Sequence, residues 1–99
     1  MITWHRTADI APGQAGPAMQ WAKEVAAHVK KTIDIETHTS MPIAGNPFRI
    51  RWSAHFESLA DMEARNGKLM SDPKYLELVG RTAQLFIAGS AFDEVWTRF

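Results

Sequence analysis

Side chains that can move protons or stabilise charge alternate with apolar residues in three short stretches of this chain. The polar positions of these stretches are Thr3, His5, Thr7, Glu36, His38, Ser40, Arg49, Arg51, Ser53 and His55. An imidazole beside a carboxylate can transfer protons near pH 7, and a guanidinium can stabilise the negative charge of an enolate or a carboxylate. We therefore predict His38 or His55 as a catalytic base and Arg51 as the catalytic residue that stabilises negative charge.

Three further residues are predicted to bind a substrate, namely His5, Glu36 and Trp52. Histidine also binds metals, but the chain contains no H-x-H or H-E-x-x-H motif, so a metal site would require His5, His38 and His55 to converge from three strands. The sequence also lacks a nucleophile elbow, a glycine-rich phosphate loop and paired carboxylates at a catalytic spacing. We predict neither a metal nor a cofactor.

The length and charge of the chain limit the classes of protein it can belong to. Its 99 residues are enough for one domain, which we place at residues 1–99. Eleven basic residues balance eleven acidic ones, so no net charge attracts nucleic acid or an anionic membrane. There is no cysteine, no apolar stretch long enough to span a bilayer, and no signal-peptide pattern at the start. We therefore expect a cytoplasmic protein that binds neither nucleic acid nor a membrane.

Hydrophobic periodicity predicts four strands and two helical regions. The strands are expected at residues 2–10, 33–41, 48–56 and 92–99, where apolar and polar residues alternate. A first helix is expected after Pro17, because apolar residues recur at helical spacing as far as Val29. A second helical region begins at Ser58, is interrupted by the helix-start signal Ser71-Asp72-Pro73, and ends at Gly89.

The predicted order is strand, helix, strand, strand, helix, strand, which is the ferredoxin-like β-α-β-β-α-β arrangement of an α+β domain. Right-handed crossovers then give an antiparallel sheet of strand order 4-1-3-2 with both helices on one face. The apolar positions predicted beneath the helices are Ile2, Trp4, Ile35, Ile50, Trp52 and Ala54. In the hairpin of the second and third strands, we expect His38 to pair with Arg51 and Glu36 to pair with Ser53. The polar face is then either open to water or covered by a partner.

Three segments resemble the dimeric α+β barrel superfamily: Ser58-Leu59-Ala60 at a helix start, Ser71-Asp72-Pro73-Lys74-Tyr75, and the closing strand Phe92-Asp93-Glu94-Val95-Trp96. Together with the order of elements, they are most similar to its NIPSNAP-like and antibiotic-biosynthesis-monooxygenase-like branches. The resemblance implies a homodimer in which two sheets face each other, with a pocket inside the barrel or between the sheet and the helices. Enclosure in such a barrel would shift the pKa values of the polar-face residues.

The resemblance leaves the reaction open. Haem-degrading members of the superfamily carry an axial histidine after the third strand and an asparagine in the first, whereas this chain has no histidine after His55 and no asparagine before Asn46. Cofactor-free oxygenases of the superfamily hold an electron-rich substrate among aromatic and polar residues. Trp4, Trp52 or Trp96 would take that role here, or would simply anchor the core. The resemblance thus indicates a homodimer that binds a small-molecule ligand as a cofactor-independent oxygenase or isomerase, or, alternatively, a non-catalytic ligand-binding or structural module.

Overall fold

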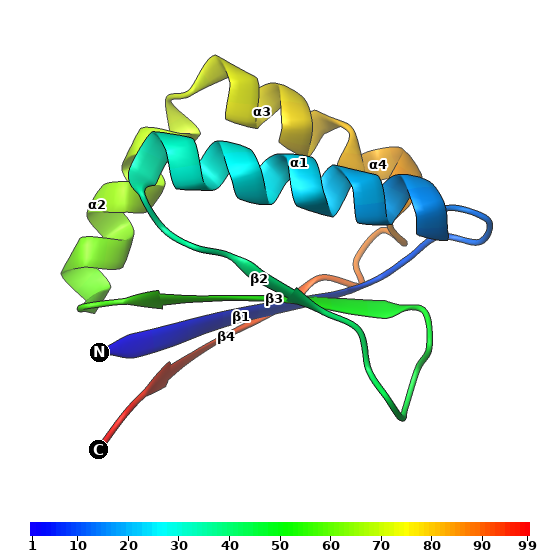
Figure 1. The fold of residues 1–99 in the computed structure, drawn as a ribbon, viewed down its shortest axis with the longest axis horizontal. Coiled ribbons are helices and arrows are strands. Elements are labelled where there is room, and N and C mark those ends of the chain that lie inside the picture. The colour runs from blue at the N-terminus through cyan, green and yellow to red at the C-terminus, as the bar shows by residue number, and fades with distance from the viewer.

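The computed structural model describes all residues from Met1 to Phe99, and it shows one layer of helices on one sheet (Figure 1). The strands are β1 (Ile2–Asp9), β2 (His38–Ser40), β3 (Arg49–Phe56) and β4 (Phe92–Thr97). The helices are α1 (Ala15–Ile33), α2 (Leu59–Met70), α3 (Pro73–Gly80) and α4 (Thr82–Leu85). The predicted ferredoxin-like α+β class is confirmed. The second helical region is divided before Pro73 as expected, but it is divided again between α3 and α4 and ends at Leu85 instead of Gly89.

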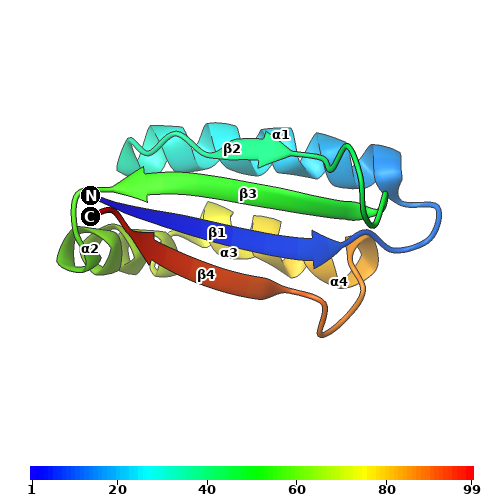
Figure 2. The same cartoon turned by 90° about the horizontal axis from the view of Figure 1, so that it is seen from below.

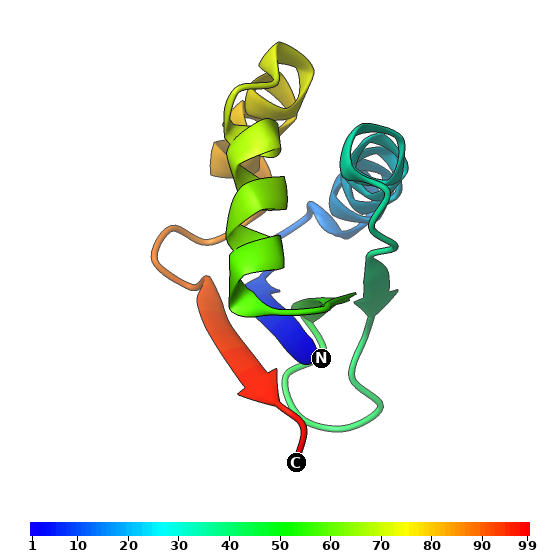
Figure 3. The same cartoon turned by 90° about the vertical axis from the view of Figure 1, so that its left-hand side faces the viewer.

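The sheet has the strand order β2-β3-β1-β4, and every neighbouring pair is antiparallel. This is the predicted order, with β1 and β3 in the centre. All helices lie on one face of the sheet, and no segment of the chain covers the other face (Figure 2). Figure 3 shows α1 standing beside α2 and α3 in the helix layer above the sheet. The two faces of the sheet therefore have different surroundings, and we call them the helix face and the outer face.

Local capping signals divide the second helical region. Ser58 Oγ accepts a hydrogen bond of 3.0 Å from the backbone N–H of Asp61, which caps the start of α2. The Asp72 carboxylate accepts a 3.0 Å hydrogen bond from the backbone N–H of Tyr75, and Pro73 occupies the first turn of α3. The chain thus begins a new helix two residues after the previous one ends, and this new helix carries Tyr75 over the sheet.

The strand predicted at residues 33–41 is wrong over most of its length. α1 continues to Ile33, and Asp34 takes the left-handed conformation (φ 55°) that ends the helix. Ile33 and Ile35 are both buried, because one packs from the last turn of α1 and the other from the segment that descends to the sheet. The alternation of Ile33 and Ile35 with polar residues therefore comes from the end of a helix and not from a strand. Only His38–Ser40 pairs with β3.

The predicted hairpin register is also wrong, by two residues. His38 lies opposite Ser53, and Arg51 lies opposite Ser40, while Glu36 precedes β2 and has no strand partner. The cause is the connection between β2 and β3, which spans residues 41–48 and is longer than the predicted strands imply. Because side chains alternate between faces with a period of two, the shift leaves His38 and Arg51 on their predicted face.

Two hydrophobic clusters attach the helices to the sheet. Buried members of the first are Ile2, Val29, Ile33, Ile35, Ala54, Phe56 and Leu69. Buried members of the second are Ala8, Ile10, Ala18, Ala22, Ile50, Trp52 and Leu85. Trp4 packs against both clusters, and each large apolar side chain that is buried in this way contributes about 1.5–3 kcal/mol of transfer free energy. The helix face is thereby fixed at both ends of the sheet.

Candidate functional site

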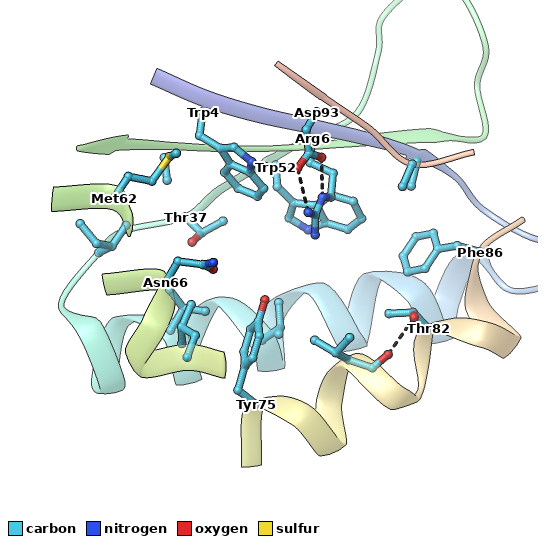
Figure 4. A pocket seen from close by; sticks show the side chains of 18 of the residues that line it. Trp4, Arg6, Thr37, Trp52, Met62, Asn66, Tyr75, Thr82, Phe86 and Asp93 are labelled. Carbon is cyan, nitrogen blue, oxygen red and sulfur yellow. Dashed lines mark hydrogen bonds and ion pairs between the residues drawn. The ribbon is translucent and has the colours of Figure 1, made fainter. Parts of the chain in front are cut away.

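A cavity of about 810 Å³ lies between the helix face of the sheet and the helices that cover it (Figure 4). Residues from β1, β3, β4 and all the helices line it, and 21 of the 29 lining residues are hydrophobic. Cavities that hold organic ligands commonly enclose about 300–1,000 Å³ and are mostly apolar, with a few polar groups that set specificity. The cavity therefore has the size and lining of a small-molecule site.

Three aromatic side chains pack edge to face in the cavity wall. The ring centroids are 5.9 Å apart for Trp21 and Trp52, 5.5 Å for Trp21 and Phe86, and 5.5 Å for Trp52 and Phe86. Trp52 is only 5% exposed, yet its Nε1–H has no hydrogen-bond partner in the chain. An unpaired buried donor costs free energy, so an acceptor oxygen of a bound molecule would be favoured there.

An ion pair stands inside this apolar cavity. Arg6 on β1 lies opposite Asp93 on β4, and both side chains line the cavity. Arg6 Nε donates to Asp93 Oδ1 at 2.6 Å and Arg6 Nη2 donates to Oδ2 at 2.8 Å, so the pair is bidentate. The guanidinium carbon lies 5.3 Å from the centroid of the Trp4 ring, whose Nε1 donates to Asp93 at 3.4 Å. These contacts orient Arg6 and leave its Nη1 available to a ligand.

The ion pair also sets the charge of both partners. The hydrogen bond from Arg6 is the main cause that lowers the pKa of Asp93, and the bond to Asp93 is the main cause that raises the pKa of Arg6. Desolvation acts in the opposite direction on each group and is weaker. The side chains are 44% and 42% exposed, so solvent screens part of their attraction. Asp93 is a carboxylate at neutral pH and a weak base.

Three uncharged polar side chains in the cavity make no hydrogen bond within the chain, and neither does the carboxylate of Glu63, which also lines it. Tyr75, on α3, directs its hydroxyl into the cavity from the helix side, while Asn66 on α2 and Thr37 before β2 lie closer to one end (Figure 4). Burial raises the pKa of Tyr75, and the positive charge of Arg6 partly opposes this. The Tyr75 hydroxyl is therefore protonated at neutral pH. It can donate a hydrogen bond to a ligand that also contacts Arg6.

Two of the predicted site residues share one row of the outer face. His38 lies opposite Ser53, Ser53 lies opposite His5, and His5 lies opposite Glu94, so this row crosses all the strands. His5 Nδ1 is buried and has no hydrogen-bond partner. Because neighbouring strands lie about 4.8 Å apart, His38 and His5 are separated by the width of β3.

The remaining predicted residues are divided between the two faces. His55 Nδ1 lies 2.9 Å from Thr3 Oγ1 on the outer face, where Arg51 is exposed. Glu36 is exposed in the segment before β2. Trp52 is the single predicted residue that lines the cavity; His5, Glu36, His38, Arg51 and His55 do not.

Sequence reasoning did not find Arg6, Asp93, Tyr75 and Asn66. A signal for Arg6 was present, because it falls on the same alternation as Trp4 and is thus a charged residue at a position that faces the helices. Asp93 is recognised as a charged residue that faces the helices only once its pairing with β1 is known. Tyr75 and Asn66 reach the cavity because of the directions in which α3 and α2 cross the sheet. Hydrophobic periodicity does not define these directions.

The chain has neither a metal-binding cluster nor a helix that could span a membrane. No group of three or more histidine and carboxylate side chains lies close enough together to hold a metal ion, and the three strand histidines do not converge. No helix combines the length and the apolar composition needed to cross a membrane. The cavity between the sheet and the helices therefore stays the candidate site for a ligand.

No protein-family model matches the sequence, and no curated protein matches it. Solved structures, however, match nearly the whole chain. A NIPSNAP domain protein from Burkholderia xenovorans has a TM-score of 0.85 at 11% sequence identity, with 100% of this chain and 95% of that protein covered. A NIPSNAP family protein of unknown function from Agrobacterium tumefaciens has a TM-score of 0.80 at 19% identity, with 97% and 86% covered.

The second group of similar structures contains oxygenases. SnoaB, a cofactor-independent oxygenase from Streptomyces nogalater, has a TM-score of 0.73 at 9% identity, and 98% of this chain and 91% of that protein are covered. A putative antibiotic biosynthesis monooxygenase from Deinococcus radiodurans has a TM-score of 0.76 at 13% identity, with 100% and 93% covered. The chain therefore has the fold of the NIPSNAP and antibiotic-biosynthesis-monooxygenase proteins, as the resemblance implied. Identities this low show the fold alone.

Proposed function

We propose that the chain binds an electron-rich aromatic or enolic molecule in the cavity between the sheet and the helices, and promotes its reaction with O₂ without a cofactor. The observation that carries this proposal is the oriented Arg6 guanidinium inside an aromatic-walled cavity. The fold that the chain shares with SnoaB supports the same class of reaction. The polar groups available in the cavity, Tyr75 and Trp52 above all, support a ligand that carries oxygen.

The geometry favours a flat molecule with an ionisable oxygen. Its rings would pack against Trp52 and the neighbouring aromatic side chains, where apolar surface leaves water. Its oxygen would accept hydrogen bonds from Arg6 Nη1 and from the Tyr75 hydroxyl, so that the anionic form is stabilised. Because the ion pair makes Asp93 a weak base, the substrate should be an acidic phenol or enol that ionises easily.

The reaction balances without a further reductant. An enolisable CH₂ group loses one proton to water to form an enolate, whose carbon takes up O₂ and a proton from water to form a hydroperoxide. Loss of water from the hydroperoxide then leaves a carbonyl, so the sum is CH₂ + O₂ → C=O + H₂O. All four electrons that reduce O₂ come from the substrate carbon, and the protein supplies stabilisation of the enolate by Arg6 and Tyr75. Return of the proton to another carbon would instead make the chain an isomerase.

Oxygen uptake with dithranol, an enolisable dihydroxyanthrone, tests this function. We expect saturable binding without oxygen and protein-dependent uptake of one O₂ per dithranol when oxygen is admitted. Arg6→Met should weaken the binding and slow the uptake, whereas Arg49→Met, a matched change outside the cavity, should leave both intact. Saturable binding with uptake no faster than in buffer would instead favour the alternative, a ligand-binding module without chemistry. No saturable binding would refute the proposal.

We also infer that the chain is a homodimer whose outer faces meet. Phe92 and Trp96 lie on the outer face of β4 and are 63% and 58% exposed, which leaves two large aromatic side chains for a second copy to cover. Light scattering should show a dimer at micromolar concentration, and a monomer there would contradict this inference. A cytoplasmic location stays a prediction from the sequence.

The polar residues of the outer face would then lie between two sheets. The proposal for this face keeps His38, His55 and Arg51 as candidate catalytic residues and His5 as a candidate binding residue. Glu36, in the segment before β2, is kept as a further candidate binding residue. Alanine replacements of His38, Arg51 and His55, one at a time, should reduce the stabilisation of the protein by its ligand if this face takes part. If all three variants keep the full effect of dithranol on the melting temperature, the outer-face site is wrong.

A further inference from the structure

Helix α3 carries Tyr75 into the cavity but is too short to hold its own position. It has eight residues, and isolated helices shorter than about 12 residues are marginal in water. Two residues, Ser71 and Asp72, separate it from α2, so it does not continue that helix. The place of the Tyr75 hydroxyl therefore depends on how α3 is attached to its neighbour α1.

Three side chains of α1 attach α3: His28 at its N-terminal end, and Trp21 and Glu24 near its C-terminal end, where Arg81 Nη1 donates to Glu24 Oε2 at 3.0 Å. Near the C-terminal end of α3, Trp21 Nε1 donates a hydrogen bond of 2.7 Å to the backbone carbonyl of Leu78, whose side chain is fully buried. At the N-terminal end, His28 Nε2 contacts Asp72 Oδ2, with Thr32 Oγ1 3.2 Å from the same imidazole nitrogen. Because a carboxylate only accepts, His28 donates from Nε2 in this pair.

One oxygen links His28 to Tyr75. Asp72 Oδ2 accepts the contact from His28 and also the 3.0 Å hydrogen bond from the backbone N–H of Tyr75. The hydrogen bond from His28 is the main cause that lowers the pKa of Asp72, so this oxygen stays anionic at neutral pH. The side chains of His28 and Asp72 are 17% and 25% exposed. Both fractions are smaller than those of the side chains in the two lysine ion pairs of the chain.

We propose that His28 is a positioning residue of the cavity: through Asp72 it fixes the first turn of α3 and keeps the Tyr75 hydroxyl directed toward Arg6. His28 itself does not line the cavity, so it acts on a ligand only through Tyr75. The effect on ligand affinity rests on the proposed function. The effect on the position of Tyr75 does not depend on any ligand.

The chain offers a direct measure of this position, because Tyr75 is its single tyrosine. The ultraviolet absorbance of tyrosinate therefore reports the ionisation of this residue alone. Burial raises the pKa of Tyr75 in the native chain. We expect His28→Leu to lower the pKa toward its ordinary value, because a loosened α3 exposes the ring to water. His28→Gln, which places a donor near the position of Nε2, should restore the native titration.

Matched variants separate positioning from general loss of structure. Thr32→Val removes the other contact of His28, leaves Asp72 untouched and should titrate like the native chain. Asp72→Ser keeps an oxygen that caps α3, but this oxygen cannot reach His28. Asp72→Ser should therefore titrate as expected for His28→Leu, and it replaces His28→Leu in the test if His28→Leu folds poorly. A native-like tyrosine titration in folded His28→Leu and Asp72→Ser would overturn the proposal.

Binding of anilinonaphthalenesulfonate, a fluorescent aromatic anion, tests the consequence for ligands. Tyr75→Phe and His28→Leu should each weaken binding about threefold to tenfold, and the double variant should be no weaker than the weaker single variant. Additive losses would mean that His28 does not act through Tyr75 and would overturn the proposal. If Arg6→Met leaves binding unchanged, the proposed function fails, while the tyrosine titration still decides the role of His28.

Discussion

Two arginine–aspartate pairs join neighbouring strands of this sheet, one on each face. On the helix face, Arg6 binds Asp93 through two hydrogen bonds of 2.6 and 2.8 Å. On the outer face, Arg49 Nε donates to Asp9 Oδ1 at 3.0 Å. The two arginine side chains are similarly exposed, 44% for Arg6 and 50% for Arg49. Exposure and charge therefore do not distinguish a binding site from a surface ion pair here.

The surroundings of the two pairs differ. The pair on the helix face lines an apolar cavity beside Trp4 and Tyr75, which lower the local polarity and exclude part of the water. The outer face carries more polar side chains, but they do not line this cavity. Arg6 is available to a ligand because it lies in a concave apolar cavity. The outer face has more polar side chains, but their number alone does not make a binding site.

The largest expected difference between the faces is in folding stability. Trp52→Ala should lower the free energy of unfolding by about 3–5 kcal/mol, because Trp52 is buried and packs against two aromatic rings. His55→Ala on the outer face of the same strand should change it by about 0.5 kcal/mol or less. Urea unfolding of both variants measures the difference. Equal losses would mean that the outer face is as tightly packed as the helix face.

The next largest difference concerns ligand affinity. Arg6→Met should weaken dithranol binding about tenfold to hundredfold, because a hydrogen bond to a charged group contributes about 1.5–3 kcal/mol. Arg49→Met should leave the dissociation constant within about twofold of the native value. Anaerobic titration followed by tryptophan fluorescence measures both. The reverse ranking would assign the ligand to the outer face.

Acid unfolding sharpens the comparison on the helix face. The pKa of Asp93 is lower in the folded chain than its ordinary value of about 3.9, so its pairing stabilises the fold above that value. This contribution is lost as the pH falls through the folded pKa. Asp93→Asn lacks it, so between about pH 5 and 2 the variant should lose less stability than the native chain. An unchanged acid dependence of the unfolding free energy would contradict the pairing of Asp93 with Arg6.

The smallest expected effect lies at the polar end of the cavity. Thr37→Val and Asn66→Leu should each change dithranol affinity about threefold or less, because each side chain offers a neutral hydrogen bond that water replaces easily. Isothermal titration calorimetry resolves changes of this size. A loss as large as that of Arg6→Met would move the centre of the site away from the ion pair.

The sequence predicted most of the fold because local signals define it. Alternation placed β1 and β3, and Ser58 and Asp72 marked the helix starts that the structure confirms. The strand at 33–41 was wrong because Ile35 alternates with polar residues without pairing. The length of a hairpin connection is not encoded in the alternation of its strands, so the register was wrong as well.

The cavity was harder to predict for a physical reason. Its polar groups come from β1, β4, α2, α3 and the segment before β2, so no single stretch of the sequence collects them. The outer face concentrates many polar residues, which is also what solvent or a partner favours on one side of an antiparallel sheet. Arg6 was the informative exception, since a charge on the apolar alternation of a central strand must find a partner.

A crystal structure of the chain with dithranol, prepared without oxygen, tests the central claim most directly. We predict density for the rings between the sheet and the helices, with an oxygen of the ligand within hydrogen-bond distance of Arg6 and Tyr75. Density confined to the outer face, beside His5, His38 and Arg51, would contradict the claim that the helix-side cavity is the functional site.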